Sequence, residues 1–295
     1  MRKMDSNFIS HGAKCAGWLY LPKDAAKSPV VIMAHGIAAQ RDFRLPVFAE
    51  RFVKKGLAVF LFDYRNFGDS DGEPRNLVSP RRHLQDWQAA IHHVRGLSDI
   101  DYGKIALWGS SFSGGHVLVT AAKNPGISAV VSQVPFVDGI STISSFDVKY
   151  QIAGMFHGLR DLTRILTFRR PHYVPVVADP GTFALMNTPE SKPGYLGIVP
   201  DNSTWKNEAP ARIILTIPMY RPINHAAKIN CPVLIIYAEN DSLISPDAVE
   251  KTADRIKNVK KVGLPAGHFD VYTGDMFEKV VAMEADFLYQ HLVEG

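Results

Sequence analysis

The feature that most constrains the fold is an alternation of short apolar runs with longer amphipathic segments. Apolar residues dominate the runs at residues 29–34, 57–62 and 104–108. A run that is apolar on every side predicts a strand buried on both faces of a sheet. Strands that alternate with helices pair in parallel through right-handed crossovers. The sequence therefore predicts an α/β fold, a parallel sheet with helices on both faces.

The remaining segments extend this pattern and also interrupt it. Strands are also predicted at residues 17–21, 127–134, 232–237 and 260–264. Helices are predicted at residues 45–55, 79–97, 112–123, 245–257 and 272–292. The alternation stops after Pro135 and resumes near residue 230, and prolines recur in between. We therefore predict a core domain from residues 1–137 and 230–295, and a mostly helical lid insertion at residues 138–229.

A serine follows the third buried strand, at the start of a predicted helix. Ligands of such sheets bind beyond the carboxyl ends of the strands, so this position is informative. Ser111 lies between Gly109 and Ser113, which are two residues away on either side. A serine on a sharp strand-to-helix turn with small neighbours is the pattern of a nucleophile elbow, although the usual motif has Gly where this chain has Ser113. We predict that Ser111 is a nucleophile; a phosphate-binding Gly/Ser turn or a plain tight loop is the alternative.

A histidine and a carboxylate follow two later strands. His268 lies between the last predicted strand and the closing helix, where a base for Ser111 belongs. Asp241 follows the strand after the insertion and is the predicted partner that orients the imidazole. Asp138, after the fourth strand, is the alternative carboxylate, and Glu239 is interpreted as a structural cap.

A developing oxyanion needs two amide donors near the nucleophile. We predict that these are the backbone N–H groups of Phe112, which follows Ser111, and of Ile37, in the loop after the first buried strand. A plain tight turn at His35-Gly36 is the alternative interpretation of that loop.

These residues together resemble the α/β-hydrolase superfamily, whose triad follows the same chain order of Ser, Asp and His. The resemblance rests on His35-Gly36, the run from Asp63 to Ser70, the elbow at Ser111, Asp241 and His268, and covers residues 15–136 and 230–292. It implies a mostly parallel eight-stranded sheet, with a structural role for residues 63–70. The sequence motifs at residues 63–65 and 109–116 resemble those of a lidded group of the superfamily. This group is dienelactone-hydrolase-like and serine-aminopeptidase-like and includes polyketide acyltransferases.

The insertion carries the residues expected to shape the substrate site. We interpret its aromatic side chains as a lining for an apolar acyl group, or alternatively as residues that hold the lid on the core. These are Phe146, Tyr150, Phe156, Phe168, Tyr173, Phe183, Tyr195, Trp205 and Tyr220. A basic cluster follows Met155 and consists of Arg160, Arg164, Arg169 and Arg170. It is interpreted as a solvated helix face, with an anionic thioester substrate as the alternative.

Composition excludes several other classes of function. The net charge of +4 indicates no nucleic-acid surface, and no dinucleotide loop or metal-ligand spacing is found, so no cofactor or metal is predicted. No signal segment and no apolar stretch long enough to cross a bilayer is found, and Cys15 and Cys231 are predicted to be free thiols. We therefore predict a cytoplasmic location, no membrane partner and a small-molecule substrate, and leave a homodimer open.

The predicted activity is that of a serine hydrolase on a carboxylic ester or thioester. An acyltransferase that uses the same triad is the principal alternative. A non-catalytic ligand binder and a peptidase are weaker alternatives.

Overall fold

The computed structural model describes residues 1–23 and 27–294. Within them the central sheet has eight strands, in the spatial order β1-β4-β6-β5-β7-β8-β11-β12. The strands are β1 (Arg2–Asp5), β4 (Gly17–Leu21), β5 (Ser28–Ala34), β6 (Ala58–Phe62), β7 (Ile100–Ser110), β8 (Ala129–Gln133), β11 (Val233–Ala238) and β12 (Val259–Leu264). Strands β1 and β4 are antiparallel to their neighbours and the other pairs are parallel.

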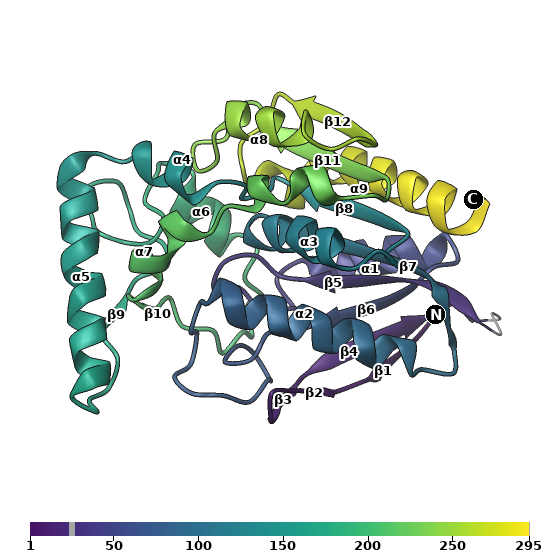
Figure 1. The fold of residues 1–295 in the computed structure, drawn as a ribbon, viewed down its shortest axis with the longest axis horizontal. Helices are drawn as coiled ribbons and strands as arrows, with labels where there is room; N and C mark the ends of the chain where they lie inside the picture. Colours follow the sequence, from purple (N-terminus) through teal and green to yellow (C-terminus); the bar gives the residue numbers. More distant parts are fainter. Residues whose placement is uncertain (24–26, 295) are drawn as a thin grey trace.

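Helices cover both faces of this sheet (Figure 1). On one face α1 (Leu45–Lys54) contacts α9 (Gly274–Tyr289), and on the other α2 (Pro80–Arg95) contacts α3 (Phe112–Lys123). Strands β5 and β6 are buried along almost their whole length, as apolar runs predict. The prediction of a mostly parallel, eight-stranded α/β sheet is confirmed.

The boundaries differ from the sequence prediction where local contacts decide them. Strand β7 begins at Ile100, four residues earlier than predicted. The closing helix, predicted at 272–292, is divided into a 3₁₀ turn (Asp270–Tyr272), α9 and a short π-helix (Gln290–Glu294). Extended backbone at Thr273 and a positive φ of 60° at Gly274 separate the first two. Strand β1 and the hairpin of β2 (Phe8–Ser10) and β3 (Ala13–Cys15) were not predicted.

The segment between β8 and β11 is irregular, as its prolines suggest. Its elements are α4 (Gly139–Ser144), α5 (Val148–Leu166), β9 (Tyr173–Val174), α6 (Ser191–Leu196), β10 (Ala209–Pro210), α7 (Ile213–Thr216) and the 3₁₀ turns of residues 217–228. Figure 1 shows α5 at one extreme of the molecule, beyond α4, α6 and α7. In the described chain, no helix combines the length and apolar character needed to cross a membrane.

The two ends of this segment are bound to each other. The carboxylate of Asp138 accepts two hydrogen bonds of 2.8 Å from the Arg221 guanidinium. The amide of Gly139 donates to the Tyr220 carbonyl at 3.0 Å, and the amide of Ile223 donates to the Val137 carbonyl at 2.9 Å. The segment therefore leaves and re-enters the core at one place.

Candidate active site

The turn between β7 and α3 holds Ser111 in an unusual backbone conformation, with φ 56° and ψ −120°. Such a conformation is unfavourable for a residue with a side chain and persists only where packing and hydrogen bonds enforce it. The Ser111 amide donates to the Gln133 carbonyl, and its own carbonyl accepts from the Phe136 amide, both at 2.9 Å. A Cβ atom at Gly109 would overlap the Ser113 carbonyl. The glycine is therefore required by close approach of the strand and helix.

Ser113 replaces the usual glycine of the elbow, and the structure gives a physical reason. Its side chain is fully buried, and its hydroxyl lies 2.9 Å from that of Tyr64. The Tyr64 hydroxyl also accepts a 2.9 Å hydrogen bond from the Trp87 indole. The close approach to the loop after β8 occurs instead at Gly115, where a Cβ would overlap the Phe136 carbonyl. Ser113 thus has room at its own position and gives a buried tyrosine a partner.

The side chains of Ser111, His268 and Asp241 form one hydrogen-bonded chain. The His268 Nε2 lies 3.0 Å from the Ser111 Oγ, and its Nδ1 lies 2.7 Å from the Asp241 Oδ2. The other Asp241 oxygen accepts two 2.8 Å bonds from the Leu243 and Ile244 amides. Because a carboxylate accepts but does not donate, it places the proton on Nδ1 and leaves Nε2 to accept from the serine.

Opposing effects set the protonation of His268, which is 2% exposed. Burial lowers its pKa, but the charge and hydrogen bond of Asp241, together with the charge of Glu190, outweigh burial and raise the pKa above its ordinary value of 6.5. An imidazole with a raised pKa is a stronger base, and it carries a proton at higher pH than a free histidine.

The alternative carboxylates are occupied elsewhere. Asp138 pairs with Arg221 and also accepts from the Ile140 amide at 3.0 Å. Asp63, at the end of β6, accepts 2.7 Å hydrogen bonds from the amide and the guanidinium of Arg41. The structure therefore places Asp241, and neither of these two, beside the imidazole.

The loop after β5 lies directly against Ser111. A Cβ built on Gly36 would lie 3.2 Å from the Ser111 Cβ, so a side chain there would crowd the serine. Within the described residues the Ile37 amide has no hydrogen-bond acceptor. Phe112 is the first residue of α3, where amides lack partners inside the helix. Ile37, Phe112 and Ser111 line the same cavity, so the amides of Ile37 and Phe112 remain the candidates for an oxyanion site.

Burial lowers the pKa of His35 to about 3, so this imidazole is neutral at ordinary pH. It lies 3.0 Å from the Gly36 carbonyl through Nδ1 and stabilises the loop.

A residue missed by the sequence analysis joins the two loops that carry Asp241 and His268. Glu190, directly before α6, accepts a 2.8 Å hydrogen bond from the His268 amide through one carboxylate oxygen. Its other oxygen accepts from the amide and hydroxyl of Ser242, at 2.9 and 2.5 Å. A lone glutamate in a proline-rich segment gives no sequence signal for such contacts, because its partners are mostly backbone groups far along the chain.

Two aromatic residues of the inserted segment hold the Ile37 loop in a similar way. The Tyr195 hydroxyl donates to the Ile37 carbonyl at 2.9 Å, and the Trp205 indole donates to the Ala38 carbonyl at 2.8 Å. Together with Glu190 they form what we call the loop clasp. The loops that carry Ile37, Asp241 and His268 therefore all bond to residues 190–205.

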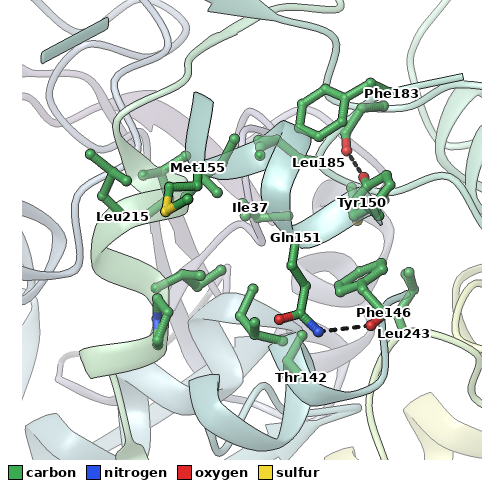
Figure 2. Close-up of a pocket in the computed structure, with 18 of the residues that line it drawn as sticks. Ile37, Thr142, Phe146, Tyr150, Gln151, Met155, Phe183, Leu185, Leu215 and Leu243 are labelled. Carbon is green, nitrogen blue, oxygen red and sulfur yellow. Dashed lines mark hydrogen bonds between the residues drawn. The ribbon is translucent and has the colours of Figure 1, made fainter. Parts of the chain in front are cut away.

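A cavity of about 440 Å³ has Ser111 in its lining. Figure 2 shows other lining residues, among them Tyr150, Phe183 and Leu185. The floor of the cavity is formed by Ile37, Ser111 and Phe112, and its walls by α4, α5, residues 183–186 and α7. Most lining side chains are aliphatic or aromatic. Gln151 is a polar exception, and it donates to the Phe146 carbonyl at 2.8 Å. The cavity therefore favours an apolar ligand beside a nucleophilic hydroxyl.

The aromatic residues named from the sequence divide into different environments. Phe146, Tyr150 and Phe183 line the cavity, and the Tyr150 hydroxyl donates to the Ala184 carbonyl. Tyr220 contacts the core instead, where its hydroxyl lies 2.5 Å from His116 Nδ1. Phe156 and Phe168 are exposed to solvent.

The arginine cluster lies largely at the surface. Arg160, Arg169 and Arg170 are exposed, as the interpretation of a solvated helix face requires. The cysteines are free, and among the described residues no group of potential metal ligands is found.

Comparison with known proteins reveals similarity over the whole chain. The sequence model described as alpha/beta hydrolase fold matches residues 29–275. The chain is 39% identical to the quorum-quenching protein AidA of Acinetobacter baumannii over 285 residues, which cover 97% of this chain and 94% of the relative. It is 28% identical to the polyketide transferase af380 of Aspergillus fumigatus, with 99% of each chain covered.

A solved structure gives the same result for the fold. The crystal structure of the alpha/beta hydrolase GrgF from Penicillium sp. sh18 superposes with a TM-score of 0.84. The alignment covers 99% of each chain at 24% identity. The similarity therefore includes the segment between β8 and β11.

Proposed function

Since the chain belongs to the α/β-hydrolase fold family, we propose that it is a serine hydrolase that cleaves an ester or thioester of an apolar acyl group. The observation that supports this most is the continuous chain of Ser111, His268 and Asp241, with separations of 3.0 and 2.7 Å, at the floor of an apolar cavity. A hydroxyl becomes a useful nucleophile when a base is positioned to take its proton.

The proposed reaction has two steps. The Ser111 Oγ attacks the acyl carbon while His268 takes its proton, and the Ile37 and Phe112 amides stabilise the oxyanion. His268 then gives that proton to the leaving alcohol or thiol as the carbon–oxygen or carbon–sulfur bond breaks, which leaves the acyl group on Ser111. Water attacks this ester with His268 again as the base, and the acid is released with the serine restored.

Covalent labelling tests the nucleophile without knowledge of the substrate. A fluorophosphonate should modify Ser111, and digestion with mass spectrometry locates the adduct. Ser111→Ala should not be labelled, and its turnover of a p-nitrophenyl ester should fall by a factor of about 10⁴–10⁶. Its circular dichroism spectrum should be unchanged. Ser110→Ala is the matched control and should keep the label. Turnover retained in Ser111→Ala would refute the proposed nucleophile.

An acyltransferase is the second candidate, and the relatives named polyketide transferase favour it. Another relative is named a thiohydrolase. The two activities share the acyl-enzyme and differ in whether water or another nucleophile accepts the acyl group. Product analysis with and without an added alcohol or amine separates them, since a transferase forms mainly the new ester or amide. A panel of open-chain esters, lactones and acyl thioesters then identifies the substrate class.

A further inference from the structure

One face of α5 carries an exposed apolar stripe with the spacing of a coiled-coil seam, and the first half of this stripe also borders the cavity. The stripe consists of Val148, Ile152, Met155, Leu159, Leu162 and Leu166, which are separated by four, three, four, three and four residues. Two helices that supercoil around each other pack through apolar residues with this repeat of about 3.5 residues. Each of the six is between 41% and 72% exposed. The helix therefore presents a seam that no described part of the chain covers.

Exposed apolar residues are concentrated on this helix. Of the 17 large hydrophobic residues exposed in the described chain, eight lie on α5, and Phe168 follows it. Scattered exposed apolar residues are normal, whereas a contiguous patch marks an interaction site. Figure 1 shows the helix at the edge of the molecule, where a second body can approach it.

The inner face of the same helix is fixed to the protein. A Cβ at Gly158 would lie 2.7 Å from the Leu215 Cγ, and one at Gly154 would lie 3.1 Å from the Ile214 Cγ2. Asp161 accepts a 2.6 Å bond from the Arg212 guanidinium. Because these contacts set the rotation of α5, the seam cannot turn inward without breaking them.

We propose that the seam pairs with α5 of a second copy of this chain, antiparallel and around a two-fold axis. The spacing reads the same in both directions, so the seam fits its own reverse. The register pairs Met155 with Leu159 of the other copy, Ile152 with Leu162, and Val148 with Leu166. Such self-complementarity is what a two-fold interface requires.

The charges beside the seam are compatible with this register. Arg160 and Arg164 lie on the flank of α5 rather than on the seam. At 1.5 Å rise per residue, the two copies of Arg160 in the dimer are about 9 Å apart along the helix axis. Their separation is larger still because they also lie on different sides of the helix pair. Exposed charges about one Debye length apart repel weakly at physiological salt. A lipid surface would need only a broad apolar face, so the 3.5-residue repeat favours a helix as the partner.

The pairing also completes the cavity above Ser111. Val148, Ile152 and Met155 belong both to the seam and to the cavity lining. In the proposed register, Leu166, Leu162 and Leu159 of the second copy lie against these three residues. Each copy thus supplies part of the other's acyl-binding wall. This consequence rests on the proposed function, whereas the pairing does not.

Sedimentation velocity over a wide concentration range tests the pairing directly. The wild-type chain should sediment as a dimer that dissociates on dilution. Leu159→Asp with Leu162→Asp should raise the dissociation constant at least about 100-fold, because each dimer would bury four unpaired carboxylates. Tyr102→Asp replaces an exposed aromatic residue on β7, outside the seam, and should leave the dimer intact. A wild-type chain that stays monomeric, or a dimer that survives both aspartates, would overturn the proposal.

Disulfide cross-linking tests the register and does not depend on a destabilised variant. Val148→Cys and Leu166→Cys proteins, each with a different tag, should form a mixed disulfide when combined under oxidising conditions. Neither should cross-link to itself, because like positions are separated by about 27 Å in the antiparallel register. Self-cross-linking of either variant would overturn the register. Binding of a monomeric chain to phosphatidylglycerol vesicles, abolished by the two aspartates, would replace the second copy with a membrane surface.

Discussion

At the scale of single residues, two carboxylates hold His268 at different atoms. Asp241 bonds its ring, whereas Glu190 bonds its backbone amide and contributes a negative charge that raises the pKa of the imidazole. A base acts in its neutral form, so the rate should fall as the pH decreases through this raised pKa, at a higher pH than for a free histidine.

Replacing Glu190 should therefore move the pH profile. Glu190→Gln removes the negative charge, which lowers the pKa of His268 and shifts the acidic limb of kcat/KM to lower pH. The pH dependence of ester hydrolysis measures this shift, and Glu278→Gln, which removes a surface carboxylate paired with Arg51, is the control. A lower rate with an unmoved limb would show that Glu190 has a structural role alone.

A second buried carboxyl predicts a change in stability with pH. Glu284 is fully buried, and burial raises its pKa to about 8 although the Trp108 indole donates to it at 3.0 Å. Between the ordinary glutamate value and about 8, the folded state binds more protons than the unfolded state, so stability decreases as the pH rises.

Glutamine at position 284 should remove this dependence. It stays neutral and can still accept from Trp108, so the Tm of Glu284→Gln should exceed that of the wild type at pH 8 by more than at pH 5. Thermal unfolding at the two pH values tests this. An equal difference in Tm between variant and wild type at the two pH values would contradict the raised pKa of Glu284.

Among single residues, those whose position follows from the topology were the most predictable from sequence. Ser111, His268 and Asp241 each follow a predicted strand, and the structure brings their side chains together. Glu190 lies in no recognisable pattern, because its role depends on backbone amides of distant loops. The sequence identifies Tyr195 and Trp205 as aromatic residues of the insertion. Their hydrogen bonds to the Ile37 loop depend on tertiary geometry and could not be predicted.

At the scale of elements, the proposed function implies that the walls of the cavity determine which acyl groups fit. Leu185 belongs to residues 183–186, which form one wall, and its side chain is drawn beside the cavity in Figure 2. Leu185→Trp should fill part of this volume. Hydrolysis of an acetyl ester should change less than threefold, whereas that of an octanoyl ester should fall more than about tenfold.

Rates for a series of p-nitrophenyl esters measure this selectivity. Leu196→Trp places the same ring on α6, away from the cavity lining, and is the matched control. An equal loss for short and long acyl groups would show that the cavity does not bind the acyl chain.

The core elements were more predictable than those of the inserted segment for a physical reason. Continuous apolar runs identify the buried strands β5 and β6, and a helical period of apolar residues identifies the long helix α2. Helices α4, α6 and α7 have four to six residues and gain most of their stability from contacts. The same applies to β1, whose four residues are exposed and pair only along one edge of the sheet.

At the scale of the whole molecule, pairing through α5 would couple stability to concentration. A dimer is favoured by mass action, so the Tm should rise with protein concentration if folded chains associate and unfolded chains do not. The Leu159→Asp, Leu162→Asp variant should lose this dependence. Differential scanning calorimetry at low and high concentration measures it, and a Tm that is independent of concentration in the wild type would argue against association.

The loop clasp has a consequence for anyone who redesigns this protein. The carbonyls of Ile37 and Ala38 and the amides of Ser242 and His268 find their partners in residues 190–205 rather than in the core. A minimal enzyme made by deleting residues 138–229 would lose donors and acceptors at three loops simultaneously. A cap transplanted from another hydrolase would have to carry a carboxylate, a phenol and an indole at equivalent places before substrate preference could be exchanged.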